Sequence, residues 1–141
     1  MSKIIQLLRR HEGVETHAYK CTAGKITVGV GRNIDPAGGL GLSEDEIDYL
    51  LENDIARVAR ELGAEFPWFS GLSECRRDAM IDLCFQLGIT RLRLFKLALG
   101  AMENQDYQEA ARQFLDSNYA KQTPNRAQEI ASMIETDQYP A

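Results

Sequence analysis

The sequence of 141 residues has no long apolar run, too few cysteines for a disulfide framework and no excess of positive charge. Each apolar stretch is shorter than the roughly 18 residues that span a bilayer, so we predict no stable membrane insertion. The opening residues, MSKIIQLLRRHEG, hold too short an apolar segment for a signal peptide, because charges interrupt it. We therefore expect synthesis in a cytoplasm, without a signal peptide.

Charge and cysteine content narrow the class of protein further. A net charge of -5 and a pI of about 5.1 argue against a protein whose main task is to neutralise nucleic-acid phosphates. Three irregularly spaced cysteines, Cys21, Cys75 and Cys84, predict free thiols, and the last two fall in or near an apolar helical stripe. His11 and His17 with Cys21 match no usual zinc spacing, so we expect no metal.

The N-terminal part of the chain combines a helical pattern with a strand pattern. Apolar residues at helical spacing predict a short helix over residues 2–11, which Ser2 caps and Gly13 ends. Residues 17–31 predict a β-hairpin that turns at residues 22–24. An irregular loop, rich in glycine and proline, is expected to follow.

The rest of the chain has a helical pattern throughout. Ser43 and Glu46 form a capping box ahead of a helix that we expect to end at Gly63. Further helices are expected to begin at Ser73, Asp106 and Thr123-Pro124. We therefore predict an α+β fold in one domain over residues 1–141. Its parts are a small lobe of hairpin and loop (12–42), a connecting helix (43–63), and a helical lobe made of residues 64–141 together with helix 2–11.

The segment KITVGVG alternates strictly between two kinds of residue, as a strand with two different faces does. The two sets are Ile26, Val28 and Val30, and Thr27, Gly29 and Gly31. We expect the apolar set to be buried and the other set to let a bulky ligand lie close to the backbone. Glu12 precedes this strand, and a carboxylate facing so bare a surface is suited to a catalytic cleft.

Three motifs then point to one family. The segment EGVETHAYKCTAGKITVGVG (12–31) is followed, in order, by FQLG (85–88) and QTPNRA (122–127). On these motifs the chain resembles the phage-type lysozymes, or endolysins, the muramidases related to T4 lysozyme (glycoside hydrolase family 24). The resemblance covers nearly the whole chain. It implies a lysozyme-like fold and an endolysin that hydrolyses the β-1,4 bond between N-acetylmuramic acid and N-acetylglucosamine in peptidoglycan.

The resemblance also implies roles for single residues. Glu12 matches the general acid of the family, and Thr27 matches the threonine that helps to place the attacking water. Phe85 and Gln113 match positions of the substrate groove, and Arg126 matches an arginine near the general acid. The chain departs from the family at two positions, described next.

Cys21 stands where the family usually has aspartate. Cys21 could replace that aspartate as base or nucleophile, with Lys20 and Lys25 favouring the thiolate. It could instead be a defect that lowers activity, or a bystander while another carboxylate, such as Glu15 or Asp35, does the work. The sequence alone does not decide among these three interpretations.

Arg32 is the second departure, since family members often have histidine there. It would either add positive charge to the cleft rim, useful against the anionic peptide stems of peptidoglycan, or only change a contact at the hairpin end. Asp82 could also face Glu12, where its negative charge would raise the pKa of the general acid.

The resemblance implies a bacteriolytic, antimicrobial monomer that lyses the host cell, with peptidoglycan as substrate, no cofactor and no nucleic acid as partner. Without a signal peptide, it would reach the cell wall in the periplasm from the host cytoplasm with the help of a holin. Two alternatives remain. A lysozyme fold that has lost catalysis would be a peptidoglycan-binding module, and residues 74–100 could form a helix-turn-helix, with Arg91, Arg93 and Lys96 contacting DNA phosphates.

Overall fold

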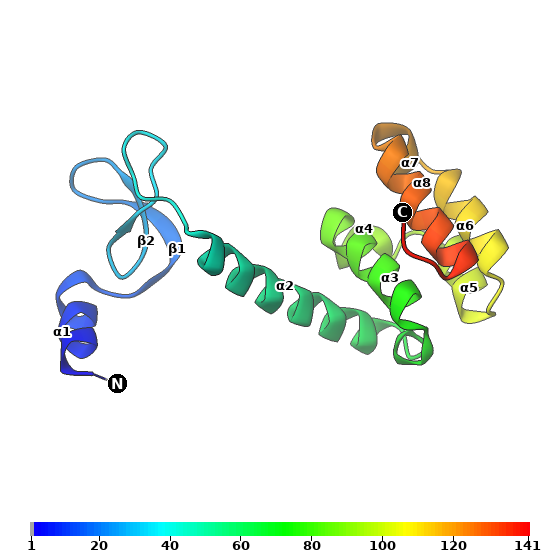
Figure 1. The fold of residues 1–141 in the computed structure, drawn as a ribbon, viewed down its shortest axis with the longest axis horizontal. Coiled ribbons are helices and arrows are strands. Elements are labelled where there is room, and N and C mark those ends of the chain that lie inside the picture. The colour runs from blue at the N-terminus through cyan, green and yellow to red at the C-terminus, as the bar shows by residue number, and fades with distance from the viewer. Residues whose placement is uncertain (1) are drawn as a thin grey trace. The chain divides into compact units, whose positions relative to one another are not determined.

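The computed structural model describes residues 2–141, so Met1, where the predicted domain begins, lies outside the described residues. The fold is α+β, as predicted: it is mostly helical, with one three-stranded antiparallel sheet in strand order β1-β2-β3 (Figure 1). The chain divides into two compact units, Met1–Leu50 and Leu51–Ala141. We describe them in turn.

The first unit holds α1 (Lys3–Glu12), β1 (Glu15–Lys20), β2 (Ile26–Gly29), β3 (Arg32–Asn33) and the start of α2 (Glu44–Glu65). The second holds the rest of α2, a 3-10 turn (Phe69–Gly71), α3 (Glu74–Leu87), α4 (Ile89–Leu92), α5 (Lys96–Glu103), α6 (Tyr107–Leu115), α7 (Asn118–Gln122) and α8 (Pro124–Thr136). No helix in the described part of the chain is both long enough and apolar enough to cross a bilayer.

The ends of α1 confirm the sequence prediction. The Ile5 N–H donates to the Ser2 hydroxyl at 3.4 Å, which satisfies one of the free N–H groups of the first turn. Gly13 ends the helix with φ +77°, and its N–H donates to the Arg9 carbonyl. Glu12 is thereby fixed as the last helical residue.

The predicted hairpin is a three-stranded meander, and the predicted burial of its faces is wrong. The strand that we expected to run to Gly31 ends at Gly29, because Gly29 and Gly31 have φ of +68° and +66° and reverse the chain into β3. Val30 therefore lies in a turn and is 37% exposed. Thr27, in the strand paired on both edges, is only 4% exposed, so the polar face of β2 is the more buried one.

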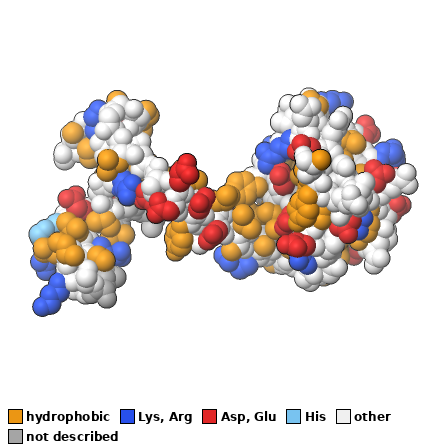
Figure 2. Space-filling view, viewed as in Figure 1, with side chains coloured by type: hydrophobic (Ala, Val, Ile, Leu, Met, Phe, Trp, Pro, Cys, Tyr) orange, Lys and Arg blue, Asp and Glu red, His pale blue; other side chains and the backbone are white. Residues whose placement is uncertain are grey.

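The start of α2 carries the predicted capping box. The Ser43 N–H donates to Glu46 Oε1 at 2.8 Å, and the Glu46 N–H donates to the Ser43 hydroxyl at 3.4 Å. Glu44 and Asp45 add two more carboxylates to the same turn, and Figure 2 shows acidic side chains gathered there. Negative charge at this end stabilises the helix dipole.

The end of α2 differs from the prediction. Gly63 does not end the helix, which continues to Glu65. Val58 and Leu62 are buried, and the Phe66 N–H donates to the Leu62 carbonyl at 2.8 Å just beyond the glycine. The burial of these apolar residues outweighs the roughly 1 kcal/mol that a glycine costs inside a helix.

The second unit is built on an apolar core in which α6 lies against α5 and α8, and α8 also against α3 (Figure 1). Its largest fully buried side chains are Phe114, Leu62, Met80, Leu83, Leu92, Met102 and Ile134. Cys75 and Cys84 are buried free thiols, as predicted.

Two of the three predicted helix starts in this unit are confirmed in full. The Ser73 hydroxyl accepts from the Arg76 N–H, and the Asp106 carboxylate accepts from the Glu109 N–H. Pro124 is the first residue of α8, as expected, but Thr123 does not cap that helix with its side chain. Its hydroxyl instead donates to the Tyr119 carbonyl at 3.1 Å.

The core predicts a large cost for truncating Phe114, which is 0% exposed and packs against Phe95 with ring centroids 5.8 Å apart. We expect Phe114→Ala to lower the free energy of unfolding by about 3–5 kcal/mol. Leu97→Ala is the control, since Leu97 is 72% exposed and its truncation should change stability by less than about 0.5 kcal/mol. Urea unfolding followed by circular dichroism measures both, and equal costs would contradict this account of the core.

Candidate active site

The three residues predicted to act in catalysis, Glu12, Cys21 and Thr27, all belong to the first unit. Glu12 is exposed at the end of α1, and its carboxylate lies over the backbone of Gly31. A Cβ atom built on Gly31 would be only 2.8 Å from Glu12 Oε2. The carboxylate therefore faces bare backbone, at the turn after β2.

The sheet brings Thr27 and Cys21 to one face. Thr27 lies opposite Tyr19 on β1 and opposite Asn33 on β3, so these three side chains share a face. Cys21 is two residues after Tyr19, which directs it to the same side. The Cys21 N–H donates to the Lys25 carbonyl at 2.9 Å and continues the pairing of the strands.

The electrostatics of Cys21 favour its thiolate. The N–H groups of Lys25 and Ala23 lower the pKa of the thiol most, burial opposes them, and the Thr27 hydroxyl lowers the pKa further. The Thr27 hydroxyl donates to the Lys25 carbonyl at 3.0 Å. The Thr27 hydroxyl has a single hydrogen, so its hydrogen bond to the Cys21 sulfur competes with its hydrogen bond to the Lys25 carbonyl.

The expected role of the lysine charges at Cys21 is wrong, because backbone N–H groups are the main cause of the lowered pKa. The Lys25 ammonium group donates to the Ala37 carbonyl at 3.2 Å and lies 4.0 Å from Asp35 Oδ2. Its charge is therefore directed toward the loop after β3.

The two carboxylates considered as substitutes for Cys21 have different surroundings. Asp35 accepts from the Ile26 N–H at 3.1 Å and from the Ala37 N–H at 2.9 Å. These two bonds, and then the charge of Lys25, lower the pKa of Asp35. Asp35 thus ties the loop to β2, whereas Glu15 is exposed on β1 opposite Gly29.

Arg32 makes a structural contact at the end of the meander. Its guanidinium group donates to both oxygens of Glu46, at 3.0 and 2.7 Å, and to the Gly41 carbonyl at 3.0 Å. The Ser43 N–H and hydroxyl, and then Arg32, lower the pKa of Glu46 to about 2. The charge of Arg32 is therefore balanced within the unit, and a role in binding substrate stays a prediction.

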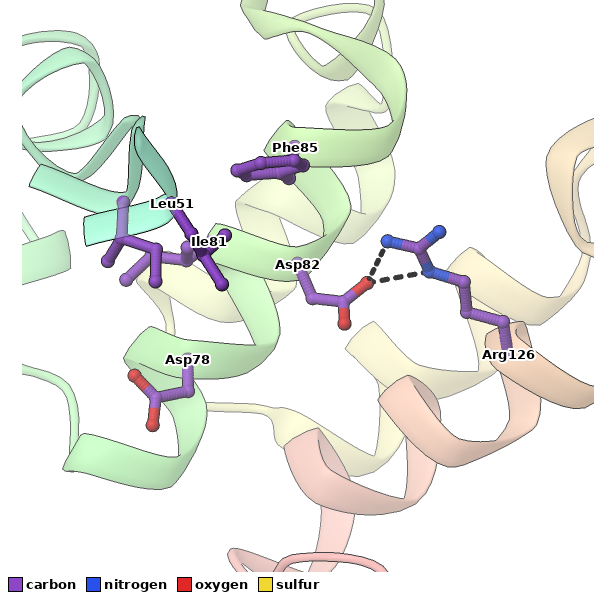
Figure 3. A pocket seen from close by; sticks show the side chains of 7 residues that line it. Leu51, Asp78, Ile81, Asp82, Phe85 and Arg126 are labelled. Carbon is purple, nitrogen blue, oxygen red and sulfur yellow. Dashed lines mark hydrogen bonds and ion pairs between the residues drawn. The ribbon is translucent and has the colours of Figure 1, made fainter. Parts of the chain in front are cut away.

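In the second unit, the structure brings together two of the predicted binding residues, Phe85 and Arg126. They line a hollow of about 380 Å³, shown in Figure 3, together with Leu51, Ile55, Asp78, Ile81 and Asp82. Arg126 donates to Asp82 Oδ1 through Nε at 2.8 Å, and Nη2 lies 2.7 Å from the same oxygen. Phe85 is 46% exposed, so its ring is open to solvent.

Gln113 lies elsewhere in that unit. Its amide donates to Glu109 Oε1 at 2.9 Å, and it lines a separate hollow of about 350 Å³ together with Lys96 and Asn104. The structure does not place Gln113 beside Phe85 and Arg126 around one hollow. Its part in substrate binding stays a prediction.

Asn33 and Tyr119 are neighbours of these sites that the sequence did not predict. Asn33 belongs to a strand of two residues, too short for any alternation to show. Tyr119 has a buried hydroxyl without a hydrogen-bond partner among the described residues, and burial, aided by Asp82, raises its pKa to about 12. No cluster of His, Cys, Asp and Glu suited to a metal ion occurs within residues 2–141.

The environment of Cys21 predicts selective alkylation. We expect Cys21 to react with iodoacetamide with a pH midpoint below its ordinary value of 9.0. Burial raises the pKa of both Cys75 and Cys84, so these thiols should react far more slowly. Peptide mass spectrometry across pH measures all three. Thr27→Val should raise the midpoint for Cys21, and a midpoint at or above 9 in the parent would contradict the assignment.

The low pKa of Glu46 predicts a loss of stability in acid. A carboxylate whose pKa is lowered from 4.5 to about 2 by folding stabilises the fold above pH 4.5 and loses that effect as the pH falls toward 2. We expect Glu46→Gln to be less stable at pH 7 and to lose less stability between pH 5 and pH 2. Glu44→Gln removes a charge from the same turn and is the matched control. Thermal unfolding monitored across that pH range tests this, and parallel curves for the parent and Glu46→Gln would contradict it.

Comparison with known proteins agrees with these motifs. The phage lysozyme family model matches residues 9–132. The chain is 28% identical to "Probable T4-type lysozyme 1" of Dictyostelium discoideum over 96% of this chain and 95% of that protein. It is 29% identical to the "Endolysin" of Acyrthosiphon pisum secondary endosymbiont phage 1, over 84% of this chain and 80% of that protein. Since the family model covers most of its length, the chain belongs to the phage lysozyme family.

Proposed function

We propose that this chain hydrolyses the β-1,4 glycosidic bond between N-acetylmuramic acid and N-acetylglucosamine in peptidoglycan, as an endolysin that lyses the host cell. The observation that carries the proposal is the position of Glu12. It is the acid of the family motif, and its carboxylate is exposed against glycine backbone in the unit that also holds Cys21 and Thr27. Membership of the phage lysozyme family supports the same activity.

Glycoside hydrolysis usually needs two groups with different tasks. Glu12, when protonated, donates its proton to the oxygen of the leaving sugar as the bond to the anomeric carbon breaks. A second group either takes a proton from the water that supplies the new oxygen, or bonds to the anomeric carbon until water displaces it. In this chain Cys21 takes the second task, because its thiolate is favoured and it shares a sheet face with Thr27.

Cys21 can perform this task in two ways, which differ in the product. As a base, the thiolate accepts a proton from a water molecule that Thr27 positions, and the attack of that water inverts the anomeric carbon. As a nucleophile, the sulfur bonds to the anomeric carbon, and subsequent hydrolysis of that bond retains the configuration. The anomer released from a chromogenic oligosaccharide, read by NMR, distinguishes the two.

The proposal gives four residues a part in substrate binding. Phe85 offers an exposed aromatic ring on which a sugar can stack. Arg126 offers a guanidinium group suited to the carboxylates of peptide stems. Gln113 and Arg32 add polar contacts. The enzyme would act as a monomer on the cell wall and reach it from the host cytoplasm through a holin.

The proposal is tested by the clearing of a peptidoglycan suspension by four proteins: the parent, Glu12→Gln, Cys21→Ser and Cys21→Asp. We expect the parent to clear, and both Glu12→Gln and Cys21→Ser to lose about 10²–10⁴ in rate, the range that a general acid or base contributes. Iodoacetamide should then also stop the parent. Circular dichroism spectra of the four proteins serve as the control for folding.

Two other outcomes would each overturn part of the proposal. An inert parent that Cys21→Asp restores would mean a lysozyme fold with a disabled site. A parent that sediments with cell-wall sacculi but never clears them, whatever residue stands at position 21, would be a peptidoglycan-binding module.

A further inference from the structure

The side chain of Glu12 lies against Gly31, in the turn between β2 and β3. We propose that Gly31 is a positioning residue: it holds the Glu12 carboxyl in place by having no side chain of its own. This inference rests on the proposed role of Glu12 as general acid. The contact itself lies wholly within the first unit.

The space at Gly31 is already filled by the carboxyl of Glu12. A Cβ atom on Gly31 would be 2.8 Å from Oε2, 3.1 Å from Cδ and 3.3 Å from Cγ of Glu12. Non-bonded carbon and oxygen atoms do not approach to 2.8 Å without strain, and the exposed Glu12 side chain is the part that can shift to relieve it. Any side chain at position 31 therefore displaces the carboxyl.

Other glycines of the same unit show that this contact is particular to Gly31. Gly29 and Gly38 also have positive φ, +68° and +87°, yet a Cβ atom on either would meet nothing within 4 Å. Those two positions need glycine for the backbone conformation alone. Gly31 needs it for the conformation and for the space that Glu12 occupies.

The backbone at Gly31 is held in place through the next residue. The next residue, Arg32, pairs with Val28 across the sheet, and its guanidinium group binds both oxygens of Glu46 and the Gly41 carbonyl. Glu46 is itself held by Ser43 in the capping box of α2. The surface against which the Glu12 carboxyl lies is thus anchored to the first turn of α2.

A fixed surface matters most for a group that transfers a proton. Glu12 is the last residue of α1 and is exposed, so its side chain would otherwise sample several rotamers. A displacement of about 1 Å at a reacting group can cost on the order of 100-fold in rate. Contact with Gly31 removes part of that freedom before substrate binds.

Thermal unfolding is measured first, as the control for folding. Gly31→Ala and Gly29→Ala place a side chain at nearly the same φ, +66° and +68°. We expect both to lower the thermal midpoint by similar amounts, because the added atom at position 31 meets only the end of the exposed Glu12 side chain, which can rotate away. A much larger loss for Gly31→Ala, which Glu12→Ala does not remove, would mean that the backbone shifts instead and would overturn the inference.

The consequence for catalysis is tested by steady-state kinetics on soluble peptidoglycan fragments. We expect Gly31→Ala to lower kcat by about 100-fold with little change in KM. A side chain at position 38 would contact nothing within 4 Å, so Gly38→Ala should retain the kcat of the parent. A rise in KM at unchanged kcat, or an equal loss in Gly38→Ala, would show that Gly31 does not position the acid.

The activity of the parent separates this inference from the proposed function. A parent without activity would overturn the role of Glu12 as an acid, and with it this inference. An active parent in which Gly31→Ala keeps the kcat of Gly38→Ala would overturn the inference alone.

Discussion

The pairing of β2 with a strand on each of its edges is the constraint on which the first unit depends. Among residues 2–50, Thr27 is the only buried residue, and no apolar side chain there is buried. Backbone hydrogen bonds therefore hold this unit, together with polar anchors such as Asp35 on β2 and Arg32 on Glu46. The same pairing places Thr27 and Cys21 on one face of the sheet. It also leads, after the end of β2 at Gly29, into the turn in which Gly31 lies against the Glu12 carboxylate.

The second unit is held in a different way. Its core is a continuous cluster of apolar side chains from Val58 to Ile134, and its ion pairs, such as Arg126 with Asp82, lie at the surface. Exposed pairs of this kind contribute little to stability, whereas each fully buried Val, Leu, Ile, Phe or Met side chain contributes about 1.5–3 kcal/mol. The candidate catalytic residues thus belong to the unit stabilised by hydrogen bonds, and Phe85 and Arg126 to the one stabilised by burial.

The sequence predicted those parts of the fold that local chemistry decides. Helix ends at Ser2, Gly13 and the Ser43–Glu46 capping box follow from side chains that satisfy nearby backbone groups, so they could be predicted from spacing. Gly63 was misjudged because the burial of Leu62 decides whether α2 continues, and burial is not a local property. The strand β3 was missed because two residues carry no periodic pattern.

The candidate site was predictable to a similar extent. The motif identified Glu12, Cys21 and Thr27 as candidates, and the structure places all three in one unit. Neither the contact of Glu12 with Gly31 nor the backbone N–H groups around Cys21 could be predicted, since both depend on how the turns fold. Lys25 was misjudged for the same reason, because its ammonium group is drawn to the loop at Ala37.

The turn after β1 is held by the backbone of residue 21 and not by its side chain. Its hydrogen bonds run from the Cys21 N–H to the Lys25 carbonyl, and from the Gly24 N–H to the Cys21 carbonyl. Both use the backbone of residue 21, and neither uses its side chain. The turn can therefore form with a thiol or a carboxylate at this position. The backbone of the turn therefore sets no limit on which polar side chain stands at position 21.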